Sequence, residues 1–170
     1  MNTTVYAVSL VLHVAAAAAW IGGLLFLVFV LVPGLRGLDD PRLRAQLIRV
    51  TGIRFRLVGW ICMGVLLFSG AGNLIGRGIG PEAWVQPAFW QAGYGRMLAW
   101  KLGLFLLLLS LSALHDWIIG PRAGAAQRAH PGSPEALKLR RMATGFGRFN
   151  LLLSLALLVL GILLSRGLTG

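Results

Sequence analysis

VYAVSLVLHVAAAAAWIGGLLFLVFVLV, residues 5–32, is an apolar run in which His13 is the one basic side chain. A helix needs ~20 apolar residues to cross a bilayer, and this run is longer than that. Inside hydrocarbon every backbone N–H and C=O has to be paired within the segment, which a helix achieves. A cleaved signal has a basic start and an apolar core of only about 7–15 residues. We therefore expect a retained first transmembrane helix.

Three further apolar runs, at about residues 57–75, 97–119 and 149–165, repeat this pattern. The chain is 57% hydrophobic and 12% charged, whereas a soluble domain carries roughly 25% charged residues. Mean hydropathy is +0.78. The sequence therefore predicts an all-α integral membrane protein, in which residues 1–170 form a single bundle of four transmembrane helices.

Small residues in the first two runs predict close helix packing, because small side chains let helix backbones approach in lipid. They are Ala18 and Gly22 in the first run, and Gly59, Gly64, Gly70 and Gly72 in the second.

Basic residues predict the orientation. The net charge is +11, and most of it lies in the first and third loops. Such loops stay in the cytoplasm, so both the N and C termini are expected outside. Because the charges flank apolar runs and form no separate basic domain, we expect no nucleic-acid partner. The basic residues are Arg36, Arg42, Arg44, Arg49, Arg54 and Arg56 in loop 1, and Arg122, Arg128, Lys138, Arg140, Arg141 and Arg148 in loop 3.

Both basic loops show helical signals. Arg42, Arg49 and Arg56 recur every seven residues opposite an apolar stripe. This predicts either an extension of the second helix or a helix lying on anionic headgroups at the cytoplasmic face. Ser133-Pro134 resembles a helix cap followed by a first-turn proline, so the fourth helix is expected to begin near Pro134.

His13 is the most informative polar residue, because ionisable groups inside membrane helices are costly and mark functional sites. It lies roughly 10 Å below the outer end of the first helix at about 1.5 Å per residue. Lys101 lies at a similar depth in the third helix, with Met97 one turn above it. His13 is expected to be a ligand or a hydrogen-bonded bundle residue. Lys101 either snorkels to the outer headgroups or acts with His13, as a ligand or as a charge that binds an anionic group.

A second set of residues lies nearer the predicted cytoplasmic face. Cys62 and Met63 in the second helix and His115 at the end of the third combine a thiol, a thioether and an imidazole, which suit a soft metal such as Cu(I). The alternative is structural. Cysteine and methionine pack in apolar cores, and a histidine near a helix C-terminus interacts with the last carbonyls.

The chain offers few groups for catalysis. Cys62 is the single cysteine, so no intrachain disulfide forms, and the absence of C-x-x-C-H excludes covalent c-type haem. No carboxylate pair, nucleophile motif or phosphate-cradling glycine loop occurs, so hydrolytic chemistry is not expected. Metal or redox chemistry stays open, and with it whether the protein is an enzyme.

Three segments resemble the CopD-type copper-resistance membrane proteins, over roughly residues 8–165. They are His13…Trp20-Ile21-Gly22-Gly23, Arg54-Phe55-Arg56-Leu57…Ser69-Gly70, and Tyr94-Gly95-Arg96-Met97-Leu98 followed by Lys101-Leu102. The resemblance implies a multi-pass protein of the bacterial inner (plasma) membrane that binds or transports copper. On this hypothesis the metal ligands are His13 and Met97 on the outer side, and Cys62, Met63 and His115 on the inner side.

The positions of His13 and Lys101 are also similar to those of HemJ-type protoporphyrinogen oxidases, in which a first-helix histidine and a third-helix lysine are implicated in haem binding. Arg148-Phe149-Asn150 resembles part of their fourth helix, but the Asn-Glu-Pro that follows in that family is absent here. This resemblance implies a b-haem redox protein with His13 as axial ligand. Lys101, Met97 or His115 would supply the other side or bind a propionate.

Three hypotheses follow from the sequence. The first is a copper-handling membrane protein, the second a b-haem-binding redox protein or oxidase, and the third a structural membrane subunit without a cofactor. Copper or haem b is the expected cofactor, and spacing alone does not separate them. A membrane or periplasmic protein partner is compatible with each hypothesis.

Overall fold

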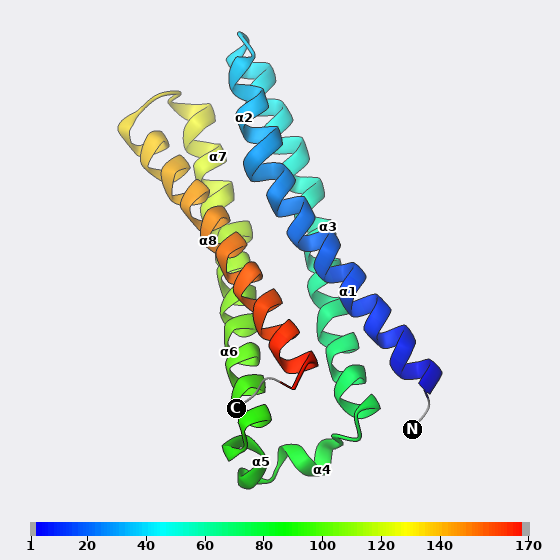
Figure 1. The fold of residues 1–170 in the computed structure, drawn as a ribbon. Helices are drawn as coiled ribbons and strands as arrows, with labels where there is room; N and C mark the ends of the chain where they lie inside the picture. Colours follow the sequence, from blue (N-terminus) through cyan, green and yellow to red (C-terminus); the bar gives the residue numbers. More distant parts are fainter. Residues whose placement is uncertain (1–2, 168–170) are drawn as a thin grey trace.

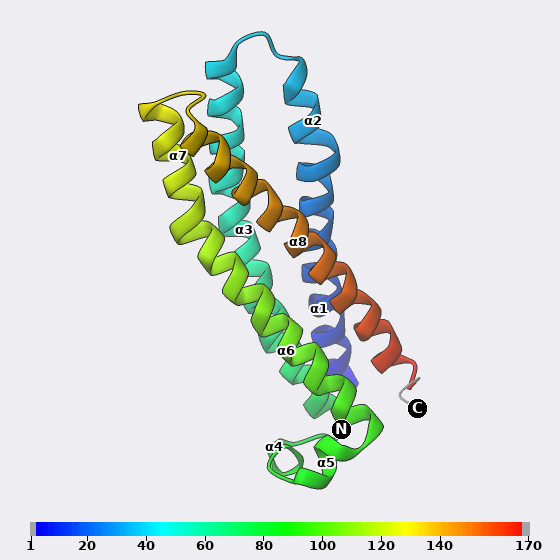
Figure 2. The same cartoon turned by 90° about the vertical axis from the view of Figure 1, so that its left-hand side faces the viewer.

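Four long helical segments run along the molecule (Figure 1, Figure 2). The computed structural model describes residues 3–167. The segments Thr3–Gly37, Arg42–Gly76, Gly93–Ala129 and Pro134–Ser165 are each long and apolar enough to cross a membrane. This confirms the predicted all-α architecture with four membrane-spanning helices.

Shorter elements interrupt and connect these segments. In chain order the elements are α1 Thr3–Leu25, a π-helical segment Phe26–Leu31, α2 Val32–Gly34, a 3₁₀ turn Leu35–Gly37, α3 Pro41–Gly76, α4 Pro81–Trp84, α5 Pro87–Gln91, α6 Gly93–Leu114, a second π-helical segment His115–Ile119, α7 Gly120–Ala129 and α8 Pro134–Ser165.

The starts of α3 and α8 follow from their caps. The carboxylate of Asp40 accepts a hydrogen bond from the backbone N–H of Arg42 at 2.8 Å, so the arginine repeat of the first loop is part of α3. The hydroxyl of Ser133 accepts from the N–H of Ala136 at 3.2 Å, and α8 begins at Pro134 as predicted. Of the two alternatives for the first loop, the helix extension is therefore the correct one.

Both π-helical segments end two residues before a proline, Pro33 or Pro121. Proline lacks an N–H, and its ring clashes with the carbonyl four residues earlier. A wider π turn at that point lets the helix continue past the proline. The first segment therefore reaches Gly37 and the third reaches Ala129, beyond the predicted ends at 32 and 119. His115 lies inside this continuous helix, so its predicted position at a helix C-terminus is wrong.

Two helix pairs make up the bundle. α1 packs along α3, α6 and α7 pack along α8, and α1 also contacts α8. The start of α1 and the end of α8 lie with α4 and α5 at one end of the molecule, which we call the terminal end (Figure 1). The α2–α3 connection and the α7–α8 turn lie at the opposite end, which we call the basic end because the arginine-rich segments are there.

Glycines on α3 let α1 approach closely, as the sequence predicts. A methyl group at Gly59 would overlap the indole ring of Trp20. A methyl group at Gly64 would meet nothing within 4 Å, so Gly64 is not needed for the approach of α1. The prediction for Ala18 and Gly22 is wrong, because both are exposed. The contacts made by α3 glycines are Gly59 with Trp20, Gly70 with His13, Gly72 with Ser9 and Gly76 with Tyr6.

The outer surface of the bundle is apolar. Phe29, Leu57 and Phe68 are 67%, 66% and 78% exposed, and they belong to a much larger set of exposed apolar side chains. Soluble monomers rarely present contiguous apolar patches of more than a few hundred Å². Lipid is the solvent that suits this surface.

Candidate functional site

Hydrogen-bonded side chains connect the helices in three groups, which we call layers. The His13 layer comprises Ser9, His13 and Ser69. The Trp20 layer comprises Trp20, Ser112, Asn150 and Ser154. The Asp116 layer comprises Arg56, Trp60, His115 and Asp116.

The His13 layer fixes both the position and the tautomer of the imidazole. His13 Nδ1 lies 2.9 Å from Ser69 Oγ. The Ser69 hydroxyl donates its only hydrogen to the carbonyl oxygen of Val65, so it has to accept from His13 Nδ1–H. Nε2 then carries the lone pair. A neutral imidazole with a lone pair on one ring nitrogen is the form that binds a metal. A hydrogen bond from the other ring nitrogen is also how metal-ligating histidines are oriented.

The backbone of α3 lies directly against this imidazole. His13 Cε1 is 3.5 Å from the position that a Cβ on Gly70 would occupy. Ser9 Oγ donates to the carbonyl oxygen of Ser69 at 2.8 Å, one turn of α1 away from His13. The glycine and the two serines therefore hold α1 and α3 together at the level of His13.

Lys101 reaches the same level from α6. Lys101 Nζ is 3.5 Å from where a Cβ on Gly161 would lie, so the side chain crosses towards α8. Met97 is half-buried one turn earlier on α6, and the described contacts do not join it to His13.

The Trp20 layer links three of the four long helices. Trp20 Nε1 donates to Ser154 Oγ at 2.9 Å, and Ser154 Oγ donates to the carbonyl oxygen of Asn150 at 2.7 Å. Asn150 Nδ2 donates to Ser112 Oγ at 3.0 Å. Trp20 also stacks on Phe55, with ring centroids 5.4 Å apart. Asn150 Oδ1 is buried without a hydrogen-bond partner among the described residues, so it is an open acceptor inside the bundle.

Cys62 and Met63 lie beside the Trp20 layer in the hydrophobic core. They are 7% and 2% exposed, and they pack in one cluster with Ala16, Trp20, Leu24 and Leu151. Their sulfur atoms are therefore shielded from water. Neither the hydrogen bonds nor this packing cluster joins them to His115.

Asp116 organises the layer nearest the basic end. Its carboxylate accepts from Trp60 Nε1 at 3.0 Å, and its backbone carbonyl accepts from the Arg56 guanidinium at 3.1 Å. His115 Nδ1 lies 3.0 Å from the other carboxylate oxygen. Trp60 stacks on Trp117 with centroids 5.0 Å apart. Asp116 thus ties α3 to the second π-helical segment and orients His115 much as Ser69 orients His13.

The candidate donors are distributed along the bundle. No group of three or more His, Cys, Asp or Glu side chains that could hold a metal ion occurs in the part of the chain that the structure describes. His13 lies nearer the terminal end, whereas Cys62, Met63 and His115 lie further towards the basic end: Trp60, two residues before Cys62 on α3, bonds Asp116, the neighbour of His115. This arrangement offers ligands at several depths and no closed metal centre.

Several partners of these residues are hard to find from sequence. Ser69, Ser112 and Ser154 lie in apolar runs, where a serine can simply bond its own helix. Trp60 resembles a core or interface aromatic. The sequence indicates that each polar group inside a membrane helix needs a partner. It does not indicate which residue is the partner, because that depends on how the helices pack.

Comparisons with known proteins agree with this architecture. The family model "Copper resistance protein D" matches residues 49–164, a range that includes Cys62, Met63, Lys101 and His115 but begins after His13. An uncharacterized protein of Aquifex aeolicus (strain VF5) is 32% identical over 158 residues, covering 93% of this chain and 94% of that relative. No solved structure matches. The chain belongs to the copper resistance protein D (CopD) family of multi-pass membrane proteins.

Proposed function

We propose that this protein moves copper through the membrane and that His13 is a ligand on the route. The observation that carries the proposal is the His13 layer, in which Ser69 accepts from His13 Nδ1–H, so that Nε2 is the nitrogen with the lone pair. An oriented neutral imidazole inside a membrane bundle suits a metal ion. The description of the family, copper resistance, supports copper as that ion.

The spread of donors supports transport over storage. A bare cation in ~30 Å of hydrocarbon is prohibitively costly, so a moving ion needs ligands at more than one depth. Imidazole, thiol and thioether groups suit copper. His13 provides such a group nearer the terminal end, and Cys62, Met63 and His115 provide them further towards the basic end, where Asn150 Oδ1 is also without a hydrogen-bond partner among the described residues.

The first test is copper accumulation in cells that express the protein. His13→Ala removes the proposed ligand, and we expect the copper gained over non-expressing cells to fall by roughly tenfold or more, since even changes to a ligand's hydrogen-bond partner cost about 10–100-fold in affinity. His130→Ala is the matched control, because His130 is exposed at the end of α7 outside all three layers. Normal accumulation in the His13 variant, with the protein present in the membrane, would contradict the proposal.

Cys62→Ser tests whether the route continues towards the basic end. The substitution keeps the size of the side chain and replaces its soft donor. If copper passes the core, accumulation falls in this variant as it does in His13→Ala. If the His13 variant loses copper while Cys62→Ser retains it, the protein has a binding site rather than a path through the core.

Haem b is the second candidate, because Lys101 extends from α6 towards α8 and has no carboxylate partner among residues 3–167. An ammonium beside an axial histidine could bind a propionate. A purified protein with haem would show a Soret band that His13→Ala removes. Against haem, α3 lies directly against the imidazole, with the Gly70 Cβ position 3.5 Å from His13 Cε1. Copper therefore fits the described residues better.

A further inference from the structure

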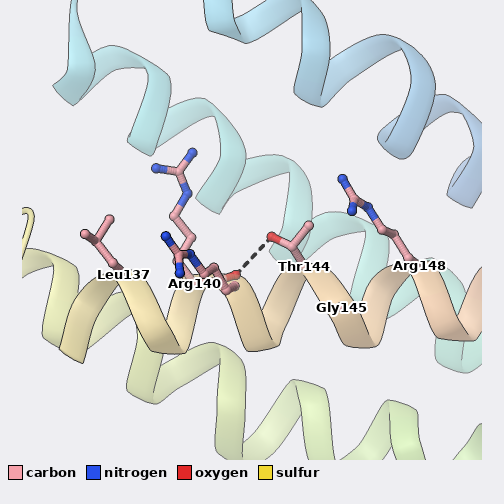
Figure 3. Close-up of a pocket in the computed structure, with 6 residues that line it drawn as sticks. Leu137, Arg140, Thr144, Gly145 and Arg148 are labelled. Carbon is pink, nitrogen blue, oxygen red and sulfur yellow. Dashed lines mark hydrogen bonds between the residues drawn. The ribbon is translucent and has the colours of Figure 1, made fainter. Parts of the chain in front are cut away.

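A hollow of about 380 Å³ lies along the part of α8 nearest the basic end. We call it the arginine groove. In Figure 3 the labelled side chains extend from one side of α8, away from the neighbouring helix drawn below it. The groove is lined by Leu137, Arg140, Arg141, Thr144, Gly145 and Arg148.

Helical spacing and small residues create the groove. Residues three, four, seven and eight apart share one helix face, which places Arg140, Thr144 and Arg148 in a row. Gly145 has no side chain, and a methyl there would meet nothing within 4 Å. The Thr144 hydroxyl donates to the carbonyl oxygen of Arg140 at 2.9 Å, so it is used by its own helix. The groove therefore has a small, largely apolar floor between guanidinium groups.

No anion in the described protein neutralises these arginines. The one ion pair among residues 3–167 joins His115 and Asp116, and no acidic residue lines the groove. An adjoining hollow shares Arg141 and adds Lys138. The positive charge is thus concentrated on one face of α8 and is open to a ligand from outside the chain.

The groove lies where the apolar part of α8 begins. Arg148 directly precedes the run from Phe149 to Leu164, and Phe149 is 48% exposed on what is a lipid-facing surface. Arg140 and Arg148 are about 12 Å apart along the axis at ~1.5 Å per residue. That span is long enough to engage two phosphate groups at the border between headgroups and acyl chains.

We propose that the arginine groove binds the phosphate groups of an acidic phospholipid, with a lipid that carries two phosphates preferred. Guanidinium groups match phosphate oxygens with paired, charge-assisted hydrogen bonds. Basic pockets beside transmembrane helices are suited to such headgroups. Leu137, Thr144 and Gly145 provide an apolar surface for the adjoining part of the lipid.

Native mass spectrometry of the purified full-length protein, titrated with cardiolipin or with zwitterionic phosphatidylcholine, tests this proposal. We expect cardiolipin to bind wild type more tightly than phosphatidylcholine does. The double variant Arg140→Gln/Arg148→Gln should bind cardiolipin roughly tenfold more weakly or worse, since each arginine near a surface contributes measurably to anionic-lipid attraction. The matched control is Arg122→Gln/Arg128→Gln, two exposed arginines on α7 with the same loss of charge.

The pattern across the variants decides the outcome. Loss of cardiolipin in the α8 variant but not in the α7 variant supports the groove. Equal loss in both variants, or loss in neither, overturns it and leaves the arginines as orientation signals. A parallel titration with inorganic pyrophosphate separates the two sources of phosphate. If pyrophosphate binds more tightly than cardiolipin and displaces it, the ligand is a soluble phosphate and the lipid assignment is wrong.

Discussion

At the scale of single residues, the hydrogen bond that the Ser69 hydroxyl donates determines the tautomer of His13. A serine has one O–H to donate, and Ser69 gives it to its own helix at Val65. His13 is thereby left to donate from Nδ1, and its Nε2 is left free. A serine that bonds back to its own helix thus sets the tautomer of a histidine on another helix, which is the feature that the proposed copper binding at His13 requires.

Ser69→Ala tests this role directly. The change removes the acceptor of His13 Nδ1–H and leaves Nε2 without a fixed orientation, so we expect copper binding by the purified protein to weaken about 10–100-fold. Ser110→Ala is the matched control, because Ser110 also donates to its own helix, at Leu106, but is exposed and contacts no histidine. Equal copper affinity in Ser69→Ala and wild type would show that His13 does not bind copper through an oriented Nε2.

At the scale of helices, the approach of α1 to α3 depends on Gly59. The Trp20 indole fills the space beside Gly59 and cannot easily move, because it stacks on Phe55 and donates to Ser154. The glycine therefore positions the Trp20 layer as well as the helix pair.

Gly59→Ala is expected to lower the thermal midpoint of the detergent-solubilised protein, because an inserted methyl group in a packed core costs about 1–3 kcal/mol. Gly64→Ala on the same helix is the control. The added methyl group meets nothing within 4 Å. The substitution therefore changes only the helix propensity of this position, which is higher for alanine, and the thermal midpoint should rise or stay constant. A Gly59 variant as stable as the Gly64 variant would contradict the packing described for α1 and α3.

The helices themselves are predictable from the sequence to different degrees. Their number follows from the apolar runs, and the start of α8 follows from Ser133-Pro134, because both signals are local. The helices continue beyond residues 32 and 119, where the apolar runs end, because π turns carry them past Pro33 and Pro121. The link from Trp60 to Asp116 depends on the relative register of two helices, which no local pattern contains.

At the scale of the whole molecule, the two helix pairs place candidate ligands in a fixed order between two ends of different charge. The described terminal end carries Arg77, Arg96 and Arg166, whereas the basic end carries the larger number of arginines in α3, α7 and the start of α8. If basic segments remain in the cytoplasm, His13 is nearer the outside and His115 nearer the cytoplasm. The direction in which copper would meet these ligands therefore depends on the orientation.

We expect a reporter that is active only outside the cytoplasm to be active when fused after Gly170 and silent when inserted at Gly132, in the turn between α7 and α8. Gly132 has φ +81° and lies outside the helices, so an insertion there disrupts no transmembrane segment. A reporter that works only in the cytoplasm should be silent after Gly170 and active at Gly132. This second reporter is the control, because it shows that a fusion that is silent with the first reporter is nevertheless expressed. The reverse pattern would contradict the orientation, because the arginine asymmetry is its sole basis. It would also make His115, held by Asp116, rather than His13 the imidazole of the proposed route that lies nearer the outside.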